Sequence, residues 1–333
     1  MKKILPLLIL LPILLLSCDN PFSDGTLFFV RVKGADLPVY VKGNLDSQTA
    51  LMVIHGGPGG DSMVYASIPA FQTIEQDYAV FYWDQRSSGS AQGNAADETM
   101  TVTQFVEDTD AVLDAVQSLY NFSSVFILGH SWGGYLGTAY VADPSHQAKI
   151  KGWIEVDGGH NLVDGMRYSR EWIMNYAQTQ TGKYWQDALA WYEATPVITF
   201  NEVIRHCAYV SKAKGYMYNE ENSEINMLPY IFTSPATFPG NTLAQLRPIN
   251  ALSQIWTEKL NPGMSAITIP ALILWGVHDG ILPVELAQDA YDALGTAPEH
   301  KSIVLFDNSA HSPMNEEGGK FAQSVLDFMT QYR

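Results

Sequence analysis

The chain has 333 residues, and 19 Lys and Arg residues stand against 35 Asp and Glu residues, so its formal charge is −16. Because this balance lacks the basic surface that binding to a phosphate backbone requires, we expect no nucleic-acid partner. With 47% hydrophobic and 16% charged residues the chain can bury a large core, and its 2 cysteines exclude a disulfide framework. These values are typical of a globular enzyme.

The N-terminus has the layout of a secretory signal. Two lysines precede an apolar run over residues 4–16, which is shorter than the roughly 20 residues that a membrane-spanning helix needs. The run ends in Leu-Leu-Ser-Cys, which resembles the lipobox of bacterial lipoproteins and implies a lipid on Cys18. We therefore expect a lipoprotein-type signal over residues 1–18 and a tether over residues 19–26. The chain would be exported from a bacterial cytoplasm and held at a membrane by its lipid, facing the periplasm or the cell exterior.

The alternative for the leader is an ordinary cleaved signal in which the cysteine is incidental. If Cys18 carries a lipid, Cys207 is the remaining thiol, and no disulfide can form within the chain. We expect Cys207 to be a half-buried structural residue without a catalytic role.

The first predicted elements are two strands over residues 27–32 and 37–41, which flank a turn at residues 34–36 and should pair antiparallel. Apolar runs without alternation follow, as in strands that are buried on both faces of a parallel sheet. They cover residues 50–54, 79–83, 125–128, 150–156, 271–275 and 302–306. Helical spacing of apolar residues appears over residues 103–119, 284–294 and 316–329.

This alternation of strand and helix predicts an α/β fold with a mostly parallel, doubly wound sheet. The sheet would be formed by residues 27–159 and 261–333. Residues 160–260 are rich in Trp and Tyr and have helical periodicity without buried-strand runs. We expect them to form a mainly helical cap, inserted before the last strands.

A nucleophile is predicted in the segment Gly129-His130-Ser131-Trp132-Gly133, which follows a predicted strand and precedes an apolar helical stretch. The G-x-S-x-G pattern in this context is typical of a sharp turn that exposes the serine hydroxyl at the start of a helix. The glycines allow the strand and the helix to approach each other closely. Ser131 is therefore the candidate nucleophile.

A serine hydroxyl needs a base, and the base needs an orienting carboxylate. Asp279 and His311 each follow one of the last two predicted strands, so both should lie at the carboxyl edge of the sheet. The chain order Ser131, Asp279, His311 is the order typical of α/β-hydrolases. Asp157, which follows another predicted strand, is the alternative carboxylate.

We do not expect the remaining histidines near these motifs to act as the base. We expect His55 and His130 to be structural and His278 to lie at the surface or behind the site. The histidines show no spacing typical of a metal site, and no cofactor is implied.

A second glycine-rich turn, His55-Gly56-Gly57-Pro58-Gly59, follows an early predicted strand. Such a turn can present a backbone N–H to a developing oxyanion, and the residue after the nucleophile supplies a second donor. This assigns the oxyanion hole to Gly57 and Trp132. A phosphate-binding loop is excluded because its Gly-Lys-Ser/Thr pattern is missing.

Together with the segment Trp83-Asp84-Gln85-Arg86, these motifs resemble the proline iminopeptidase group of the α/β-hydrolase fold. The resemblance implies that Ser131 is acylated, that His311 moves the proton and that Asp279 orients His311. It also implies that the Asp-Gln-Arg run shapes the loop beside the site. Ser87 stands where the family usually has Gly directly after this run.

The resemblance further implies an aminopeptidase that releases the N-terminal residue of short peptides. Family members bind the substrate's α-amino group with cap carboxylates, and the cap of this chain does not align with theirs. The candidates here are Glu171, Glu193, Glu202, Glu220, Glu221 and Glu224. A carboxylesterase or C–C bond hydrolase of the same fold is one alternative, and a non-enzymatic binding lipoprotein is another. An epoxide hydrolase or dehalogenase of this fold would have aspartate at position 131.

Overall fold

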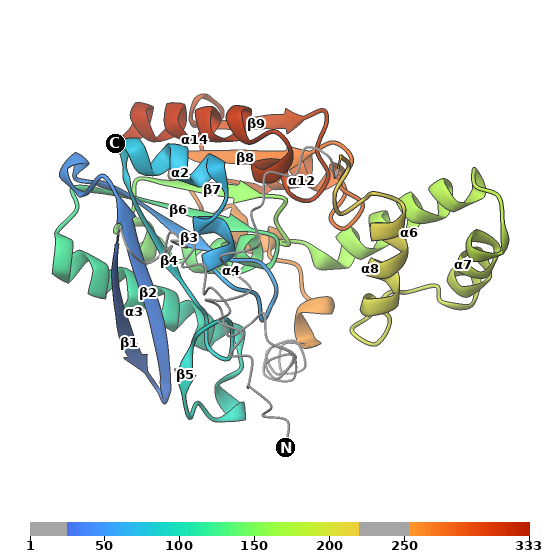
Figure 1. Cartoon of the computed structure of the whole chain (residues 1–333), viewed down its shortest axis with the longest axis horizontal. Coiled ribbons are helices and arrows are strands. Elements are labelled where there is room, and N and C mark those ends of the chain that lie inside the picture. The colour runs from blue at the N-terminus through green and yellow to red at the C-terminus, as the bar shows by residue number, and fades with distance from the viewer. Residues whose placement is uncertain (1–24, 220–252) are drawn as a thin grey trace, which may run out of the picture.

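The computed structural model of the chain describes residues 25–219 and 253–333 (Figure 1). The predicted signal over residues 1–18 with its Cys18, residues 19–24 of the predicted tether and residues 220–252 of the predicted cap lie outside the described residues. In the described part, no helix has the length and apolar character needed to cross a membrane.

The centre of the molecule is a mixed, mostly parallel sheet, which confirms the predicted fold class. Its strands follow the spatial order β1-β2-β4-β3-β6-β7-β8-β9, and β5 pairs with β2. Their bounds are β1 (Thr26–Val32), β2 (Ala35–Gly43), β3 (Thr49–Ile54), β4 (Ala79–Trp83), β5 (Gln92–Gly93), β6 (Ser124–His130), β7 (Gly152–Val156), β8 (Ala271–Gly276) and β9 (Lys301–Phe306).

All the predicted strands are present, with bounds that differ by up to two residues. β1 and β2 pair antiparallel with Phe29 opposite Pro38, whereas the pairs from β4 through β3 and β6 to β9 are parallel. β1 begins at Thr26, which the sequence had placed in the tether. Because the parallel strands point the same way, the loops that follow β3, β6, β8 and β9 meet at one edge of the sheet.

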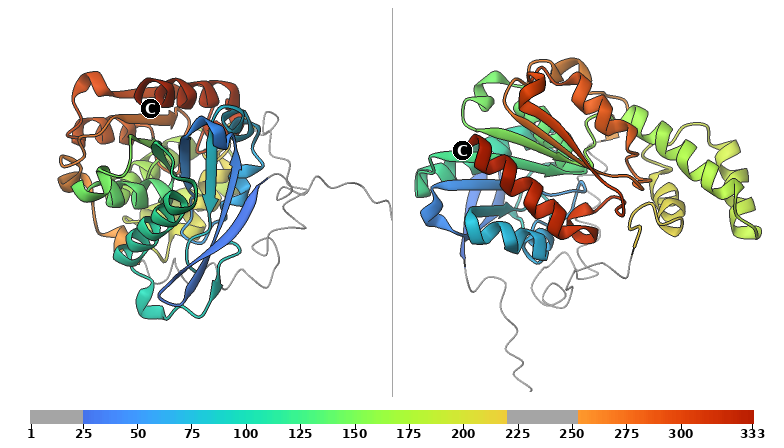
Figure 2. Two further views of the ribbon diagram at one scale, coloured as in Figure 1. Left: turned by 90° about the vertical axis from the view of Figure 1, so that its left-hand side faces the viewer. Right: turned by 90° about the horizontal axis from the view of Figure 1, so that it is seen from above.

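The two faces of the sheet are buried under different helices, and alternate residues of each strand face opposite ways. Along β3, Met52 and Ile54 join one apolar core, whereas Leu51 and Val53 join the other. The first core lies under α3 (Val102–Tyr120), α4 (Trp132–Val141) and α12 (Glu285–Ala293), and the second under α2 (Pro69–Asp77) and α14 (Gly318–Tyr332). Figure 2 shows these two helical layers on either side of the sheet. Short helices lie in the connections: α1 (Met63–Ala66), α5 (Pro144–Gln147), α11 (Asn261–Met264) and α13 (Pro313–Glu316).

The last predicted helix, over residues 316–329, is present as α14, which begins two residues later than predicted and is separated from α13 by a break. α13 ends at Glu316 and α14 begins at Gly318, while Glu317 has φ −130° and ψ 48°. The Glu317 carboxylate accepts hydrogen bonds from the Asn308 N–H and the Ser309 hydroxyl. This contact with the preceding loop and the poor helix propensity of glycine explain the break.

Between β7 and β8 lie α6 (Leu162–Gln178), α7 (Lys183–Ala194) and α8 (Val203–Lys212), followed by a 3₁₀ turn over Ser253–Trp256. Figure 1 shows α6, α7 and α8 beyond the edge of the sheet toward which β8 and β9 point. Within this part of the described chain the regular elements are helical. The exact division between sheet domain and cap stays a prediction.

Candidate active site

Ser131 lies in the turn between β6 and α4, with φ 58° and ψ −120°. This backbone conformation is rare for a residue with a side chain and persists only where the surroundings enforce it. Two glycines permit it: a Cβ on Gly129 would overlap the carbonyl of Gly133, and a Cβ on Gly133 would overlap the carbonyl of Ile54. Close packing of β3, β6 and α4 therefore requires glycine at both positions.

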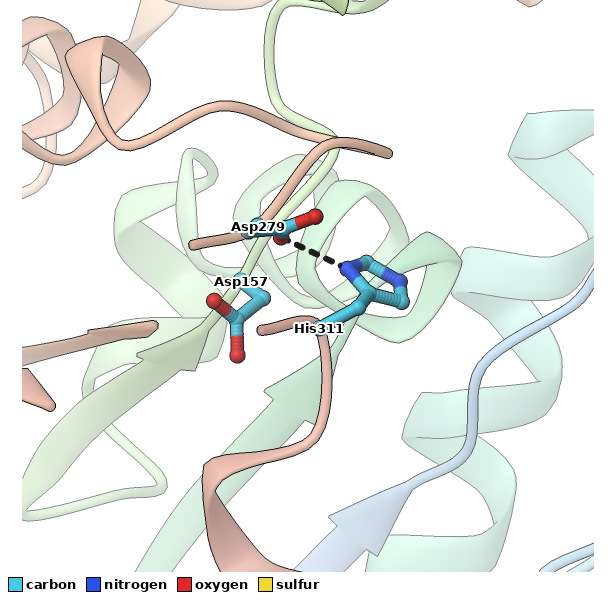
Figure 3. Close-up of side chains that lie close together, drawn as sticks. All are labelled: Asp157, Asp279 and His311. Atoms are coloured by element: carbon cyan, nitrogen blue, oxygen red, sulfur yellow. Dashed lines mark hydrogen bonds and ion pairs between the residues drawn. The ribbon is translucent and has the colours of Figure 1, made fainter. Parts of the chain in front are cut away.

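The loops after β6, β8 and β9 bring the three predicted residues into one hydrogen-bonded chain. The Ser131 hydroxyl donates to Nε2 of His311 over 3.0 Å, and Nδ1 of His311 donates to Oδ2 of Asp279 over 2.7 Å. The other carboxylate oxygen of Asp279 accepts from the N–H groups of Ile281 and Leu282 at 2.7 and 2.9 Å. Figure 3 shows His311 and Asp279 facing each other. The base and its carboxylate are thus held in fixed orientation.

The protonation state of His311 follows from its burial. Burial lowers the pKa of His311 to about 3, so the imidazole is neutral near neutral pH. Because its Nδ1–H is directed at Asp279, its Nε2 has a lone pair for the Ser131 proton. The geometry is that of a general base beside a nucleophile.

Asp157, the alternative carboxylate, lies beside Asp279 (Figure 3). Ligand atoms of Asp157, Asp279 and His311 lie within 4.8 Å of one another, a spacing that a metal ion could also use. Burial raises the pKa of Asp157 well above its usual range, and the charge of Asp279 raises it further. Burial also raises the pKa of Asp279, but the N–H groups of Leu282 and Ile281 oppose this by stabilising its charged form.

The two carboxyl groups therefore share one negative charge, and we place it on Asp279. Asp279 accepts two backbone N–H bonds and the imidazole N–H, whereas Asp157 accepts one, from Gly276 at 2.9 Å. Asp157 is the protonated member of the pair.

The two predicted oxyanion donors belong to the turn after β3 and to the start of α4. Gly57, in the turn after β3, has φ 134° and lines the same cavity as Ser131. Trp132 is the first residue of α4, where backbone N–H groups have no partner within the helix.

Gln85 connects the turn after β3 to Trp132. Its side-chain oxygen accepts from the Trp132 indole N–H at 2.7 Å, and its side-chain NH₂ donates to the His55 carbonyl at 3.0 Å. Its backbone N–H donates to Nε2 of His55 at 3.1 Å. Burial lowers the pKa of His55 to about 4, which keeps this ring neutral. Gln85 and His55 therefore hold the positions of the two candidate donors relative to each other.

The two neighbours of Gln85 in the sequence stabilise the loop that follows β4. Asp84 accepts from the backbone and hydroxyl of Ser62 and from the Ser90 N–H, and Arg86 forms two 2.6 Å bonds with Asp108. Ser87 has φ 56°, a conformation that glycine adopts more easily than other residues. This explains why the proline iminopeptidase group usually has glycine at this position.

Two residues in the site escaped the sequence analysis. The Tyr65 hydroxyl accepts from the Gly56 N–H and donates to Nδ1 of His130, which confirms the structural role expected of His130. Asp61, four residues after Gly57, lines the cavity of Ser131. The signal available for Asp61 was its position directly after the glycine-rich turn.

The cavity beside Ser131 has a volume of about 490 Å³. Its walls are formed by the turn after β3, by Ser131 and His311, and by Cys207, Ser211 and Tyr216 from α8 and the segment after it. Cys207 is half-buried, as expected, and burial raises its pKa to about 11, so the thiol is protonated. It nevertheless contributes to the wall of the cavity.

Three of the six candidate cap carboxylates belong to the described residues. Glu171 is paired with Arg167, Glu193 is exposed on α7, and Glu202 bonds Thr199. None of these three lines the cavity. Glu220, Glu221 and Glu224 lie outside the described residues. His278 is partly exposed, and its ring stacks on Tyr218, so it lies at the surface.

A buried ionic cluster, also unforeseen, lies where the chain leaves and re-enters the sheet domain. His160 bonds Glu155 at 2.7 Å through Nδ1 and contacts Asp289 at 3.3 Å through Nε2. Leu260 donates its N–H to the His160 carbonyl, and the Asn261 side chain donates to Asp289. The cluster therefore connects the two crossings, which are the segments around His160 and around Leu260 and Asn261, to α12.

Comparison with known proteins places this site in a family. The family described as serine aminopeptidase, S33, matches residues 46–208. A proline iminopeptidase of Heyndrickxia coagulans is 34% identical over 321 residues, covering 92% of this chain and 99% of the relative. The probable aminopeptidase YbaC of Bacillus subtilis is 26% identical over 286 residues, covering 83% and 87%.

Among solved structures, the proline iminopeptidase of Mycobacterium smegmatis has a TM-score of 0.64 at 20% identity and covers 92% of this chain and 98% of its own. At this identity the likeness shows the fold. The sequence relatives show the family as well as the fold. The chain belongs to the α/β-hydrolase family and has proline iminopeptidases among its relatives.

Proposed function

We propose that the protein is a serine aminopeptidase that releases the N-terminal residue of short peptides by acyl transfer. The observation that carries the proposal is the hydrogen-bonded chain Ser131–His311–Asp279 at the wall of a cavity. The relatives described as aminopeptidase and proline iminopeptidase support a peptide substrate.

In the first half of the reaction, the Ser131 oxygen attacks the carbonyl carbon of the substrate while His311 Nε2 takes the hydroxyl proton. The carbonyl oxygen becomes an oxyanion, and the N–H groups of Gly57 and Trp132 stabilise it. When the C–N bond breaks, His311 gives the proton to the leaving amine. The products of this half are an acyl-serine and the shortened peptide.

In the second half, water attacks the acyl carbon and His311 takes one of its protons. The second tetrahedral intermediate collapses, the bond to the Ser131 oxygen breaks, and the proton returns to that oxygen. The free amino acid leaves. Asp279 keeps the imidazole in the required tautomer throughout and stabilises the imidazolium that forms in each half.

The cavity limits the substrate to something small. A volume of about 490 Å³ accommodates one or a few residues and excludes a folded protein chain.

The test compares alanyl- and prolyl-β-naphthylamide with p-nitrophenyl acetate, using the full chain purified in detergent. We expect turnover of at least one amide, with a loss of about 10⁶-fold in kcat for Ser131→Ala. Ser131-dependent hydrolysis of the ester alone would identify a carboxylesterase instead. Absence of any Ser131-dependent turnover would favour a binding protein of this fold.

We further propose that Cys18 carries a lipid anchor and that the enzyme faces outward from a bacterial membrane. The support is the basic start, the short apolar run and the Leu-Leu-Ser-Cys ending of the leader. The test is partitioning into Triton X-114 after expression in a bacterium. Cys18→Ser should move the protein from the detergent phase to the aqueous phase, and an unchanged distribution would reject the anchor.

A further inference from the structure

The turn that holds the Asp279 carboxylate is bound by helices of the predicted cap. Oδ1 of Asp279 accepts the N–H groups of Ile281 and Leu282, and Gly280 lies between the carboxylate and these two donors. The orientation of the Gly280 peptide groups therefore decides how the carboxylate is aligned with His311. Because Gly280 is buried, its own N–H and carbonyl need partners within the protein.

The N–H and the carbonyl of Gly280 both have partners in the predicted cap. The Gly280 N–H donates to the carbonyl of Gly215, in the segment after α8, at 2.8 Å. The Gly280 carbonyl accepts from the Ser169 hydroxyl, in α6. A Cβ on Gly280 would lie 2.7 Å from the Trp172 ring of α6 and 2.9 Å from a methyl group of Val210 in α8. The cap helices therefore pack directly against this residue.

Ser169 is fixed by a chain of hydrogen bonds through the other two cap helices. Nε2 of His206, in α8, donates to the Ser169 oxygen at 2.7 Å, and Nδ1 of His206 accepts from the Tyr192 hydroxyl, in α7, at 2.9 Å. Burial lowers the pKa of His206 to about 4, so the ring is neutral and carries one N–H. With this N–H on Nε2, each group donates to the next, and the Ser169 proton is directed at the Gly280 carbonyl.

The segment after α8 is also bound to the loop that holds His311. The His311 N–H donates to the carbonyl of Tyr216 at 3.2 Å. The Glu316 carboxylate accepts from the N–H of Asn219, in the same segment, and from the N–H of Ala310, each at 2.7 Å. The predicted cap therefore forms hydrogen bonds with the loops after both β8 and β9.

We propose that the cap helices position the base of the reaction, and that Ser169 is the positioning residue through which they act. The Ser169 hydroxyl holds the Gly280 carbonyl, and the turn keeps the Asp279 carboxylate in line with Nδ1 of His311. The inference rests on the proposed acyl transfer by Ser131 and applies to an amide and to an ester alike. The cap helices then do more than form a wall of the cavity, because the orientation of the base depends on them.

The test compares Ser169→Ala with Tyr192→Phe in the full chain purified in detergent. Each variant removes one hydroxyl from the same buried chain of hydrogen bonds, but Ser169→Ala alone removes the donor to the Gly280 carbonyl. The substrate is whichever of alanyl-β-naphthylamide and p-nitrophenyl acetate the parent hydrolyses through Ser131. We expect Ser169→Ala to lower kcat by about 10- to 100-fold and to leave KM within about threefold. Tyr192→Phe should lower the urea midpoint of unfolding and keep kcat within about threefold of the parent.

Two further measurements separate positioning from a general loss of structure. If Ser169 acts through Asp279, Ser169→Ala should lower the residual kcat of Asp279→Asn by less than about threefold, whereas a loss of folded protein would act equally in both backgrounds. Amide hydrogen exchange gives a readout without substrate. The peptide that contains Ile281 and Leu282 should exchange faster in Ser169→Ala than in the parent or in Tyr192→Phe, because the bonds to Asp279 open more often.

The outcomes are distinct for the two proposals. If the parent shows no Ser131-dependent turnover of either substrate, the proposed acyl transfer and the role of Ser169 in it both fail. If the parent is active and Ser169→Ala has the parental kcat, the acyl transfer stands and the role of Ser169 is wrong. Equal losses of kcat in Ser169→Ala and Tyr192→Phe, or equal losses from Ser169→Ala with and without Asp279→Asn, would also overturn that role and assign Ser169 to the stability of the cap.

Discussion

His130 donates a hydrogen bond from Nε2 to the main-chain carbonyl oxygen of His311, over 2.7 Å. On its other side, Nδ1 accepts from the Tyr65 hydroxyl at 2.7 Å, and the Tyr65 oxygen accepts from the Gly56 N–H at 2.9 Å. Burial lowers the pKa of His130 to about 3, so the ring stays neutral and the direction of these bonds is fixed. One chain of hydrogen bonds thus connects the turn after β3, the nucleophile turn and the loop that holds His311.

Replacing Tyr65 with Phe should disturb both stability and catalysis. The change leaves the Gly56 N–H and His130 Nδ1 without their partner in a buried place, which should cost about 1–3 kcal/mol of unfolding free energy. Because the same chain positions His311, we expect kcat to fall by about 10-fold. Chemical denaturation and steady-state kinetics on the preferred substrate measure the two effects.

The matched control for Tyr65→Phe is Tyr78→Phe, which removes a hydroxyl bonded to Thr330 at 2.8 Å, outside the residues that line the cavity. It should lower stability by about 1 kcal/mol and leave kcat unchanged. Equal kcat values in the two variants would show that the hydrogen bonds through Tyr65 and His130 do not position His311.

Asp279 and Asp157 can be distinguished by replacing each with asparagine. Asp279→Asn presents an amide to Nδ1 of His311 and favours the wrong tautomer, so kcat should fall by about 10⁴-fold. Asp157→Asn keeps an acceptor for the Gly276 N–H and changes no charge if Asp157 is protonated, so kcat should stay within about tenfold of the parent. Reversed effects would make Asp157 the partner of His311.

The pH dependence of ester hydrolysis reports the state of His311. Burial lowers its pKa to about 3, so the base stays neutral and active when the pH falls below 6.5, the usual pKa of histidine. We expect kcat/KM on p-nitrophenyl acetate to be level from pH 8 to pH 6.5 and to decline only at lower pH, where circular dichroism checks that the fold persists. A decline centred at or above pH 6.5 would contradict this assignment.

The sequence predicted the sheet and the candidate site residues Ser131, Asp279 and His311 because both depend on local patterns. Buried parallel strands have apolar runs, and a strained nucleophile turn needs glycines next to the serine, so Gly129 and Gly133 were informative. The break between α13 and α14 at Glu317 depends on a contact with Asn308, which no periodicity reveals.

The missed residues share a cause, which is that their roles arise from tertiary contacts. Tyr65 and His130 are far apart in the sequence, and only folding brings their side chains together. The relation between Asp61 and the cavity depends on how the turn after β3 faces α8. His160 follows a predicted strand, yet its partner Asp289 lies 129 positions away in the chain.

The cluster of His160, Glu155 and Asp289 should make stability depend on pH. Burial lowers the pKa of His160, but the charges of Glu155 and Asp289 outweigh this and raise it to about 9. The folded value lies above the unfolded value of about 6.5, so protonated His160 stabilises the fold. This contribution, on the order of 3 kcal/mol, is complete below pH 6.5 and disappears as the pH rises through 9.

The double variant His160→Gln, Glu155→Gln removes the titrating ring together with its buried counter-charge, so no isolated charge is left in the core. Urea unfolding at pH 6, 7.5 and 9 should show that the parent loses more stability than the double variant as the pH rises. His278→Gln, at the surface, should follow the parent. Parallel curves for parent and double variant would mean that His160 is neutral in the folded protein. The hydrogen bonds of Leu260 and Asn261 would then join the two crossings without a charge on His160.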